Sequence, residues 1–164
     1  VESERTGGLA IARGQPGGSF APPEPIAPNL AVRAMTLADL DEDGRQDLIV
    51  ANTKNDHIVT LRGDGEGLVE VASLSAAPLV PRTMTPYDLD RDGHLDILVT
   101  DPELTSVVVL QGGEEGALTG EVWVLWFDAP VDQLAVADVN ADGVRDLIAG
   151  TFSRNSVTVH LSSP

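Results

Sequence analysis

Cysteine is absent from the 164 residues, and basic residues are scarce. Without cysteine there is no disulfide framework, no thiolate nucleophile and no cysteine-based zinc site. Ten Lys and Arg residues stand against 26 Asp and Glu residues, which gives a formal net charge of −16. A surface this acidic repels nucleic-acid phosphates and anionic lipid headgroups. The composition therefore argues against a nucleic-acid partner.

Long apolar runs are also missing. No stretch approaches the roughly 20 apolar residues that a membrane-spanning helix needs, so we expect no insertion into a membrane. The first residues, VESERTGGLA, lack a signal-peptide pattern, and we read them as the start of a processed or excised chain. Apolar residues come instead in short β-branched runs such as DLIVAN and SVVVLQG, which predict strands.

An acidic decapeptide occurs three times, at intervals of 49 and then 50 residues. It reads DLDEDGRQDL from Asp39, DLDRDGHLDI from Asp88 and DVNADGVRDL from Asp138. One short apolar segment precedes each copy and two follow it, and in two units a Gly-rich turn leads into a fourth. Four short strands per roughly 50 residues are typical of a β-propeller blade. We therefore expect an all-β fold of about three four-stranded blades, divided into a half blade (1–30), two blades (31–80 and 81–130) and an incomplete blade (131–164).

Three blades are too few to close a ring, because propellers use roughly four to eight. Further blades could lie outside this sequence or on another chain. Alternatively, copies of this chain could associate so that the N-terminal strands of one complete the last blade of another. We therefore expect either a homo-oligomer or a part of a larger propeller.

The decapeptide places oxygen ligands at positions 1, 3, 5 and 9, with a backbone carbonyl available at position 7. Hard oxygen ligands around a tight turn suit Ca²⁺, and glycine at position 6 permits the turn. The predicted ligands are Asp39, Asp41, Asp43, the Arg45 carbonyl and Asp47 in the first loop, Asp88, Asp90, Asp92, the His94 carbonyl and Asp96 in the second loop, and Asp138, Asn140, Asp142, the Val144 carbonyl and Asp146 in the third loop. We expect three Ca²⁺ sites, the third being the weakest because Asn140 replaces a carboxylate.

Three other readings of these loops are less favourable. An EF-hand needs a bidentate Glu at position 12 and flanking helices, but Val50, Val99 and Ala149 stand there and strand-forming runs follow. Mg²⁺ prefers a strict octahedron that keeps several waters. Metal-free turns would hold four carboxylates together without a cation, and these would repel one another.

The chain resembles FG-GAP repeats of the VCBS type, as in integrin α-subunit propellers and secreted bacterial proteins. The matching features are the three DxDxDGxxD or DxNxDGxxD loops, the V-x-V third strands with their glycine turns, and GGSFAPP at 17–23. The Phe that gives the repeat its name is lacking in GEGLVE and EGALTG. The resemblance implies structural Ca²⁺, an extracellular or cell-surface location, and protein partners bound by the loops opposite the metal. In this chain those loops carry Lys54, Asn55, Glu103, Arg154 and Asn155, which could equally be ordinary solvated residues.

No catalytic constellation is visible in the sequence. The histidines, His57, His94 and His160, fall at unrelated positions of their units, and no nucleophile or phosphate-binding motif appears. We therefore expect a non-catalytic adhesion or interaction module. A lectin-like module and a purely architectural set of blades are the alternatives. We expect the few aromatic residues, Tyr87, Trp123 and Trp126, to pack between blades rather than to stack on sugars.

Overall fold

The computed structural model describes residues 8–27, 29–75 and 80–162. In these residues the chain forms thirteen β-strands and two 3₁₀ turns, η1 (Glu114–Gly116) and η2 (Phe152–Arg154), and no α-helix. The prediction of an all-β fold built from propeller-like blades is therefore confirmed. Within the described part of the chain, no helix has the length and apolar character to cross a membrane.

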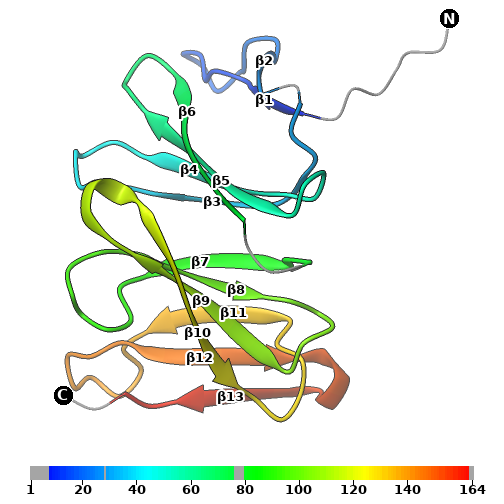
Figure 1. The fold of residues 1–164 in the computed structure, drawn as a ribbon, viewed down its shortest axis with the longest axis vertical. Helices are drawn as coiled ribbons and strands as arrows, with labels where there is room; N and C mark the ends of the chain where they lie inside the picture. Colours follow the sequence, from blue (N-terminus) through cyan, green and yellow to red (C-terminus); the bar gives the residue numbers. More distant parts are fainter. Residues whose placement is uncertain (1–7, 28, 76–79, 163–164) are drawn as a thin grey trace, which may run out of the picture.

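The strands form four separate antiparallel sheets (Figure 1). The first sheet pairs β1 (Leu9–Ile11) with β2 (Glu24–Ala27). The second runs in the order β3 (Val32–Ala38), β4 (Asp47–Asn52), β5 (His57–Gly63) and β6 (Leu68–Ser75). The third runs in the order β7 (Thr83–Tyr87), β8 (Asp96–Thr100), β9 (Ser106–Gly112) and β10 (Leu118–Trp126). The fourth contains β11 (Gln133–Ala137), β12 (Asp146–Thr151) and β13 (Ser156–His160).

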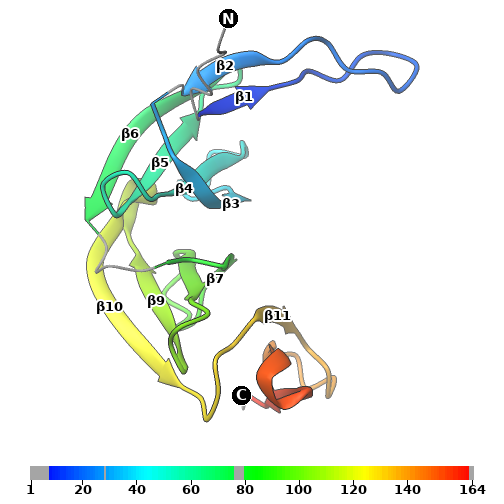
Figure 2. The same cartoon turned by 90° about the vertical axis from the view of Figure 1, so that its right-hand side faces the viewer.

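The sheets follow one another along a curved row (Figure 2). The first strands β3, β7 and β11 lie on its inner side, and β6 and β10 lie on its outer side. β7 lies beside β3 on one side and beside β11 on the other. This is how blades stand around a propeller axis, although the described strands cover only an arc and close no ring.

Apolar side chains of successive sheets fill the space between them, because each strand presents alternate residues to opposite faces. On β4, Leu48 and Val50 pack toward β1 and β2, while Ile49 and Ala51 pack toward the β7–β10 sheet. On β8 the alternation repeats one blade further on: Ile97 and Val99 face the β3–β6 sheet, and Leu98 faces β12. The three junctions between sheets therefore form the core.

Surfaces without a neighbouring sheet remain exposed. On the last sheet, Val157 and Val159 of β13 are 68% and 46% exposed. On the inner strand β3, Met35 and Leu37 are also exposed, whereas Met84, which occupies the same place on β7 as Met35 does on β3, is buried against the preceding sheet.

The aromatic residues deviate from our expectation. Tyr87 is half-buried and packs against the cluster between the last two sheets. Trp126, however, is 75% exposed and Trp123 is 40% exposed, so the prediction that both tryptophans pack between blades is wrong. The reason is their place on β10, which pairs only with β9 and forms the outer edge of its sheet.

Candidate metal centres

All three acidic loops connect the first and second strands of a sheet, and all three have the same backbone conformation. The glycine at position 6 has a positive φ in each loop: 85° at Gly44, 96° at Gly93 and 87° at Gly143. The residue at position 4 also adopts the left-handed backbone conformation, with φ of 59° at Glu42, 64° at Arg91 and 60° at Ala141. Non-glycine residues rarely adopt this conformation. Nothing in the side chains of Glu, Arg or Ala at position 4 predicts it.

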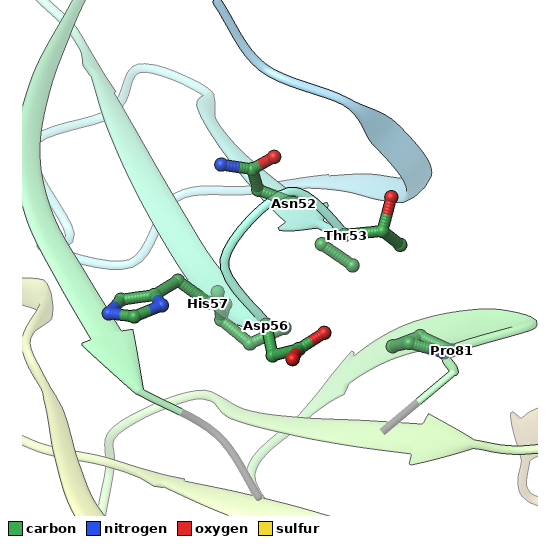
Figure 3. Close-up of a pocket in the computed structure, with 7 residues that line it drawn as sticks. Asn52, Thr53, Asp56, His57 and Pro81 are labelled. Carbon is green, nitrogen blue, oxygen red and sulfur yellow. The ribbon is translucent and has the colours of Figure 1, made fainter. Parts of the chain in front are cut away.

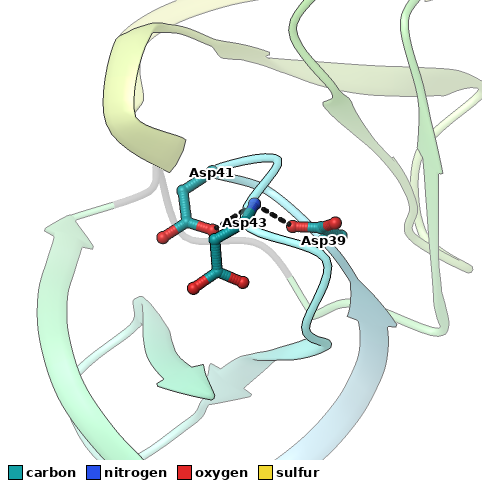
Figure 4. A group of neighbouring side chains, drawn as sticks. All are labelled: Asp39, Asp41 and Asp43. Atoms are coloured by element: carbon teal, nitrogen blue, oxygen red, sulfur yellow. Dashed lines mark hydrogen bonds between the residues drawn. The ribbon is translucent and has the colours of Figure 1, made fainter. Parts of the chain in front are cut away.

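The aspartates at positions 1, 3 and 5 turn inward and accept hydrogen bonds from backbone N–H groups of their own loop. In the first loop, Asp39 accepts from the N–H groups of Asp43 (3.1 Å) and Gly44 (2.9 Å), and Asp41 accepts from that of Asp43 (3.3 Å). Asp43 in turn accepts from the Arg45 N–H at 2.9 Å. Figure 4 shows the three carboxylates gathered around this turn. The bonds hold oxygen-bearing side chains on the same side of the loop.

The second loop repeats this pattern closely. Asp88 accepts from the Gly93 N–H at 3.1 Å, Asp90 from the Asp92 N–H at 3.2 Å, and Asp92 from the His94 N–H at 2.8 Å. One atom is left over: Oδ1 of Asp88 is buried and has no hydrogen-bond partner among the described residues. Buried polar atoms are nearly always partnered, so an orphaned carboxylate oxygen marks a place where a cation would fit.

The third loop keeps the backbone contacts but differs in its side chains. Asp138 accepts from the Gly143 N–H at 3.0 Å, and Asp142 accepts from the Val144 N–H at 2.8 Å. Asn140 accepts from the Asp142 N–H through its Oδ1, and its Nδ2 donates to the Asp142 carboxylate at 2.9 Å. The Asn140 amide therefore uses one oxygen of Asp142 as a hydrogen-bond acceptor. It also supplies no carboxylate of its own, unlike the aspartates at position 3 of the other two loops.

The aspartate at position 9 has a second role that the spacing alone does not reveal. Asp47, Asp96 and Asp146 are buried, and each accepts two backbone N–H bonds. One donor is the residue at position 2, and the other lies at or just past the end of the third strand. For Asp96 the donors are Leu89 and Gly112, both at 2.9 Å. This side chain therefore fastens the acidic loop to the third strand.

The glycines at the third-strand end are the signal that sequence reasoning overlooked. A Cβ placed on Gly63 would lie 2.4 Å from the Gln46 carbonyl oxygen, and one on Gly112 would lie 2.4 Å from that of Leu95. The glycine therefore lets the strand approach close enough for its N–H to reach the position 9 carboxylate.

Two groups of carboxylates have oxygens close enough to share one metal ion. In each group, one oxygen per residue lies within 4.8 Å of the others; the groups are Asp39, Asp41 and Asp43 in the first loop and Asp88, Asp90 and Asp96 in the second loop. Asp47 and Asp92 do not join these groups, and no such group occurs among the described acidic residues of the third loop. Among the residues that the structure describes, two acidic clusters could therefore hold a metal ion.

The environment of Asp96 favours a neighbouring positive charge. Burial raises the pKa of this carboxyl above its ordinary value, because desolvation disfavours the charged form. The N–H bonds from Gly112 and Leu89 act in the opposite direction, and the charges of Asp90 and Asp92 raise the pKa further. A cation among these carboxylates would favour the ionised state of all of them.

The opposite ends of the sheets carry the loops between second and third strands. At the β4–β5 loop, Asn52 donates to Asn55 at 2.9 Å, and a small cavity lies between this loop and Pro81 (Figure 3). Its volume of about 10 Å³ is near the lower limit for a single water molecule. At the last sheet, Arg154 donates to the side chain and the carbonyl of Asp128. A larger, open hollow of about 230 Å³ lies beside the β12–β13 loop and is lined by Thr151, Phe152 and Asn155, among others.

Sheets of antiparallel strands along an arc, with an acidic turn after the first strand of three of them, define a propeller-type repeat protein. A family model described as FG-GAP-like repeat matches the chain twice, over residues 39–99 and 88–149. The chain therefore belongs to the FG-GAP-like repeat family. Among curated proteins none matches it.

Proposed function

We propose that this chain is a calcium-stabilised, non-catalytic FG-GAP module that acts outside the cell in binding protein partners. The orphaned, buried Oδ1 of Asp88 carries the proposal, because the carboxylates of Asp90 and Asp96 gather beside Asp88 and no group among the described residues satisfies this oxygen. The membership in the FG-GAP-like repeat family supports the choice of Ca²⁺ and of an extracellular setting.

The ligands would be the side chains at positions 1, 3, 5 and 9 and the backbone carbonyl at position 7 of each loop. A bound Ca²⁺ supplies positive charge that offsets the repulsion between these carboxylates. The residues themselves prepare the site, since their N–H bonds already fix the turn and the buried position 9 aspartate ties it to the third strand. Calcium would thus stabilise the blade rather than take part in a reaction.

Protein partners would bind to the loops between second and third strands, at the ends of the sheets opposite the metal loops. The cavity beside the β4–β5 loop has room for about one water molecule, and the hollow of about 230 Å³ beside the β12–β13 loop is open to solvent, so both suit a surface contact better than an enclosed small ligand. Asn55 is already fixed by Asn52, and Arg154 by Asp128, so these side chains would be presented in defined positions.

Direct counting of bound calcium tests the metal assignment. Equilibrium dialysis of the metal-stripped chain against Ca²⁺, followed by metal analysis, should give about two ions per chain at ~100 μM calcium and a third at ~1 mM. A matched preparation with Mg²⁺ at the same concentration should retain fewer ions, because Mg²⁺ keeps several of its waters. Retention of no calcium at millimolar concentration would contradict the proposal.

A carbohydrate-binding module is the second candidate, and the exposed tryptophans of β10 favour it. Trp126 is 75% exposed and Trp123 is 40% exposed, and sugar rings stack on such faces. A glycan array with the unmodified chain, and with Trp123→Ala and Trp126→Ala as matched variants, separates the candidates. Binding that disappears with either tryptophan would support the lectin-like function, and a blank array would exclude it.

A further inference from the structure

The first and second loops carry the same four aspartates, but their surroundings differ in charge. Position 7 is Arg45 in the first loop and His94 in the second. The residue before the last of the third strand is Arg62 on β5 and Gln111 on β9. Both places lie beside the carboxylates, so the two loops offer a cation the same ligands in different electrostatic settings.

Arg62 is bound directly to a predicted ligand of the first loop. Its Nε lies 2.8 Å from Oδ2 of Asp41, whose side chain is only 10% exposed. Its Nη2 donates to the carbonyl of Glu115 at 2.9 Å, which belongs to η1 of the next sheet. A Cβ on the neighbouring Gly116 would lie 3.0 Å from the Asp41 N, so the turn packs tightly on the loop. The guanidinium is therefore held in place from two sides.

Gln111 occupies the corresponding place at the second loop without a charge. Its Nε2 donates to Oδ2 of Asp90 at 3.2 Å. Among the described residues, no Lys or Arg forms a salt bridge with Asp88, Asp90, Asp92 or Asp96. The second loop therefore has no basic side chain paired with a ligand carboxylate; its own Arg91, at position 4 where the first loop has Glu42, is exposed and forms no such pair. The second loop also contains the orphaned Oδ1 of Asp88.

A second arginine acts on the first loop more weakly. Arg45 Nη1 lies 2.8 Å from Oδ2 of Asp43, but the Arg45 side chain is more than half exposed. Water screens such a pair, and the side chain can swing away when a cation arrives. The Arg62 side chain is 40% exposed, but it also donates to the Glu115 carbonyl and faces a nearly buried carboxylate, so its charge is held closer to the ion than that of Arg45.

From this difference, and on the basis of the proposed calcium function, we infer that Arg62 sets the order of calcium affinity. The second loop binds Ca²⁺ more tightly than the first, because a cation at Asp41 must share that carboxylate with the guanidinium and is repelled by it. One unit charge about 5 Å from a divalent ion at a protein surface changes the dissociation constant by on the order of tenfold. The first loop is therefore an arginine-attenuated site.

Exchange of the two residues tests the inference. Isothermal titration calorimetry of the metal-stripped chain with CaCl₂ should resolve a tight binding step at the second loop and a weaker binding step at the first loop. Arg62→Gln should tighten the weaker step about tenfold and leave the tight step unchanged, because it removes one neighbouring charge. Gln111→Arg should weaken the tight step by a similar factor. Gln111→Arg leaves the Arg62–Glu115 contact intact, so this variant still tests the inference if Arg62→Gln lowers the stability of the chain.

Arg13 provides a matched control. Arg13 Nη2 donates to the carbonyl of Glu66 at 3.2 Å. This hydrogen bond to the next sheet is equivalent to the one that Arg62 makes with Glu115. Arg13 forms no salt bridge with a described carboxylate of the three loops. Arg13→Gln should leave every calcium constant within twofold of the unmodified chain.

The outcomes separate this inference from the proposed function. Calcium binding with constants that neither exchange moves by more than twofold would overturn the order of affinity and leave the calcium function standing. A tighter second loop after Gln111→Arg would also overturn it. No heat of binding in the unmodified chain would overturn the proposed function, and the order of affinity with it.

Discussion

The β7–β10 sheet and the β11–β13 sheet have nearly the same strand pattern but very different burial. Val109 on β9 and Val159 on β13 stand at the same place, each paired with the second residue after the position 9 aspartate, Leu98 and Ile148 respectively. Val109 is fully buried, whereas Val159 is 46% exposed. The alternation of apolar residues thus specifies a strand, and the neighbouring sheet decides whether that strand contributes to a core.

The two faces of the last sheet also differ in burial according to whether a neighbouring sheet covers them. Leu147 and Ala149 on β12 are buried in the junction with the β7–β10 sheet, together with Leu98 and Val107. The other face has no neighbouring sheet in the described part of the chain, and Val157 is exposed there. Equivalent substitutions in the two sheets should therefore have unequal effects on stability.

The largest difference is expected between two glycines. Gly112→Ala places a Cβ 2.4 Å from the Leu95 carbonyl and disturbs the N–H bond to Asp96, so it should lower the free energy of unfolding by about 3 kcal/mol. Gly150→Ala in the last sheet meets its nearest atom at 3.6 Å, so it should change stability by less than about 0.5 kcal/mol. Urea unfolding at a fixed calcium concentration measures both, and equal losses would contradict the close approach at Gly112.

A smaller difference is expected between the two equivalent valines. Val109→Ala removes two methyl groups from a filled junction and should cost about 2 kcal/mol. Val159→Ala removes the same atoms from a half-exposed face and should cost less than about 0.5 kcal/mol. The pair is compared by the shift of the urea midpoint at constant slope. If Val159→Ala proved as costly as Val109→Ala, the face of the last sheet would have to be covered in solution.

The smallest difference is expected between two ion pairs. Arg82, the residue before β7, bridges to the buried Asp132, which also accepts the Phe152 N–H at 2.7 Å and so links the start of β7 to the last sheet. Arg82→Ala should cost about 1 kcal/mol because it leaves a buried carboxylate with one partner fewer. Arg154→Ala removes the exposed pair with Asp128 and should cost less than about 0.5 kcal/mol. Thermal unfolding in low and high salt checks both, and only the exposed pair should lose its contribution in high salt.

The repeated decapeptide and the short β-branched runs were sufficient to predict strands, sheets and the position of the acidic loops. These features are local: alternation sets the strand, and Asp-Gly sets the turn. The approach of Arg62 to Asp41 was not predictable, because it depends on how β5 lies beside the first loop and on η1 of the next sheet. The same holds for the N–H bonds of Asp47 and for the exposure of Trp126, which follow from sheet packing.

The third loop contains a side-chain contact that the sequence did not predict. Its sequence predicts a weaker site because Asn140 has no charge, and the structure adds the hydrogen bond from Asn140 Nδ2 to Asp142. That hydrogen bond depends on the side-chain conformations of Asn140 and Asp142, which cannot be predicted from the spacing of the ligand positions.

Thermal unfolding with and without calcium tests the central claim, that cations in the acidic loops stabilise the blades. The chain is measured in EDTA, in about 1 mM CaCl₂ and in about 1 mM MgCl₂ as the ionic-strength control. At a Kd of about 10 μM, each site adds about 2.7 kcal/mol, so two such sites should raise the Tm by on the order of 15 °C. A Tm that is the same in EDTA and in CaCl₂ would contradict the account and leave the loops as metal-free turns.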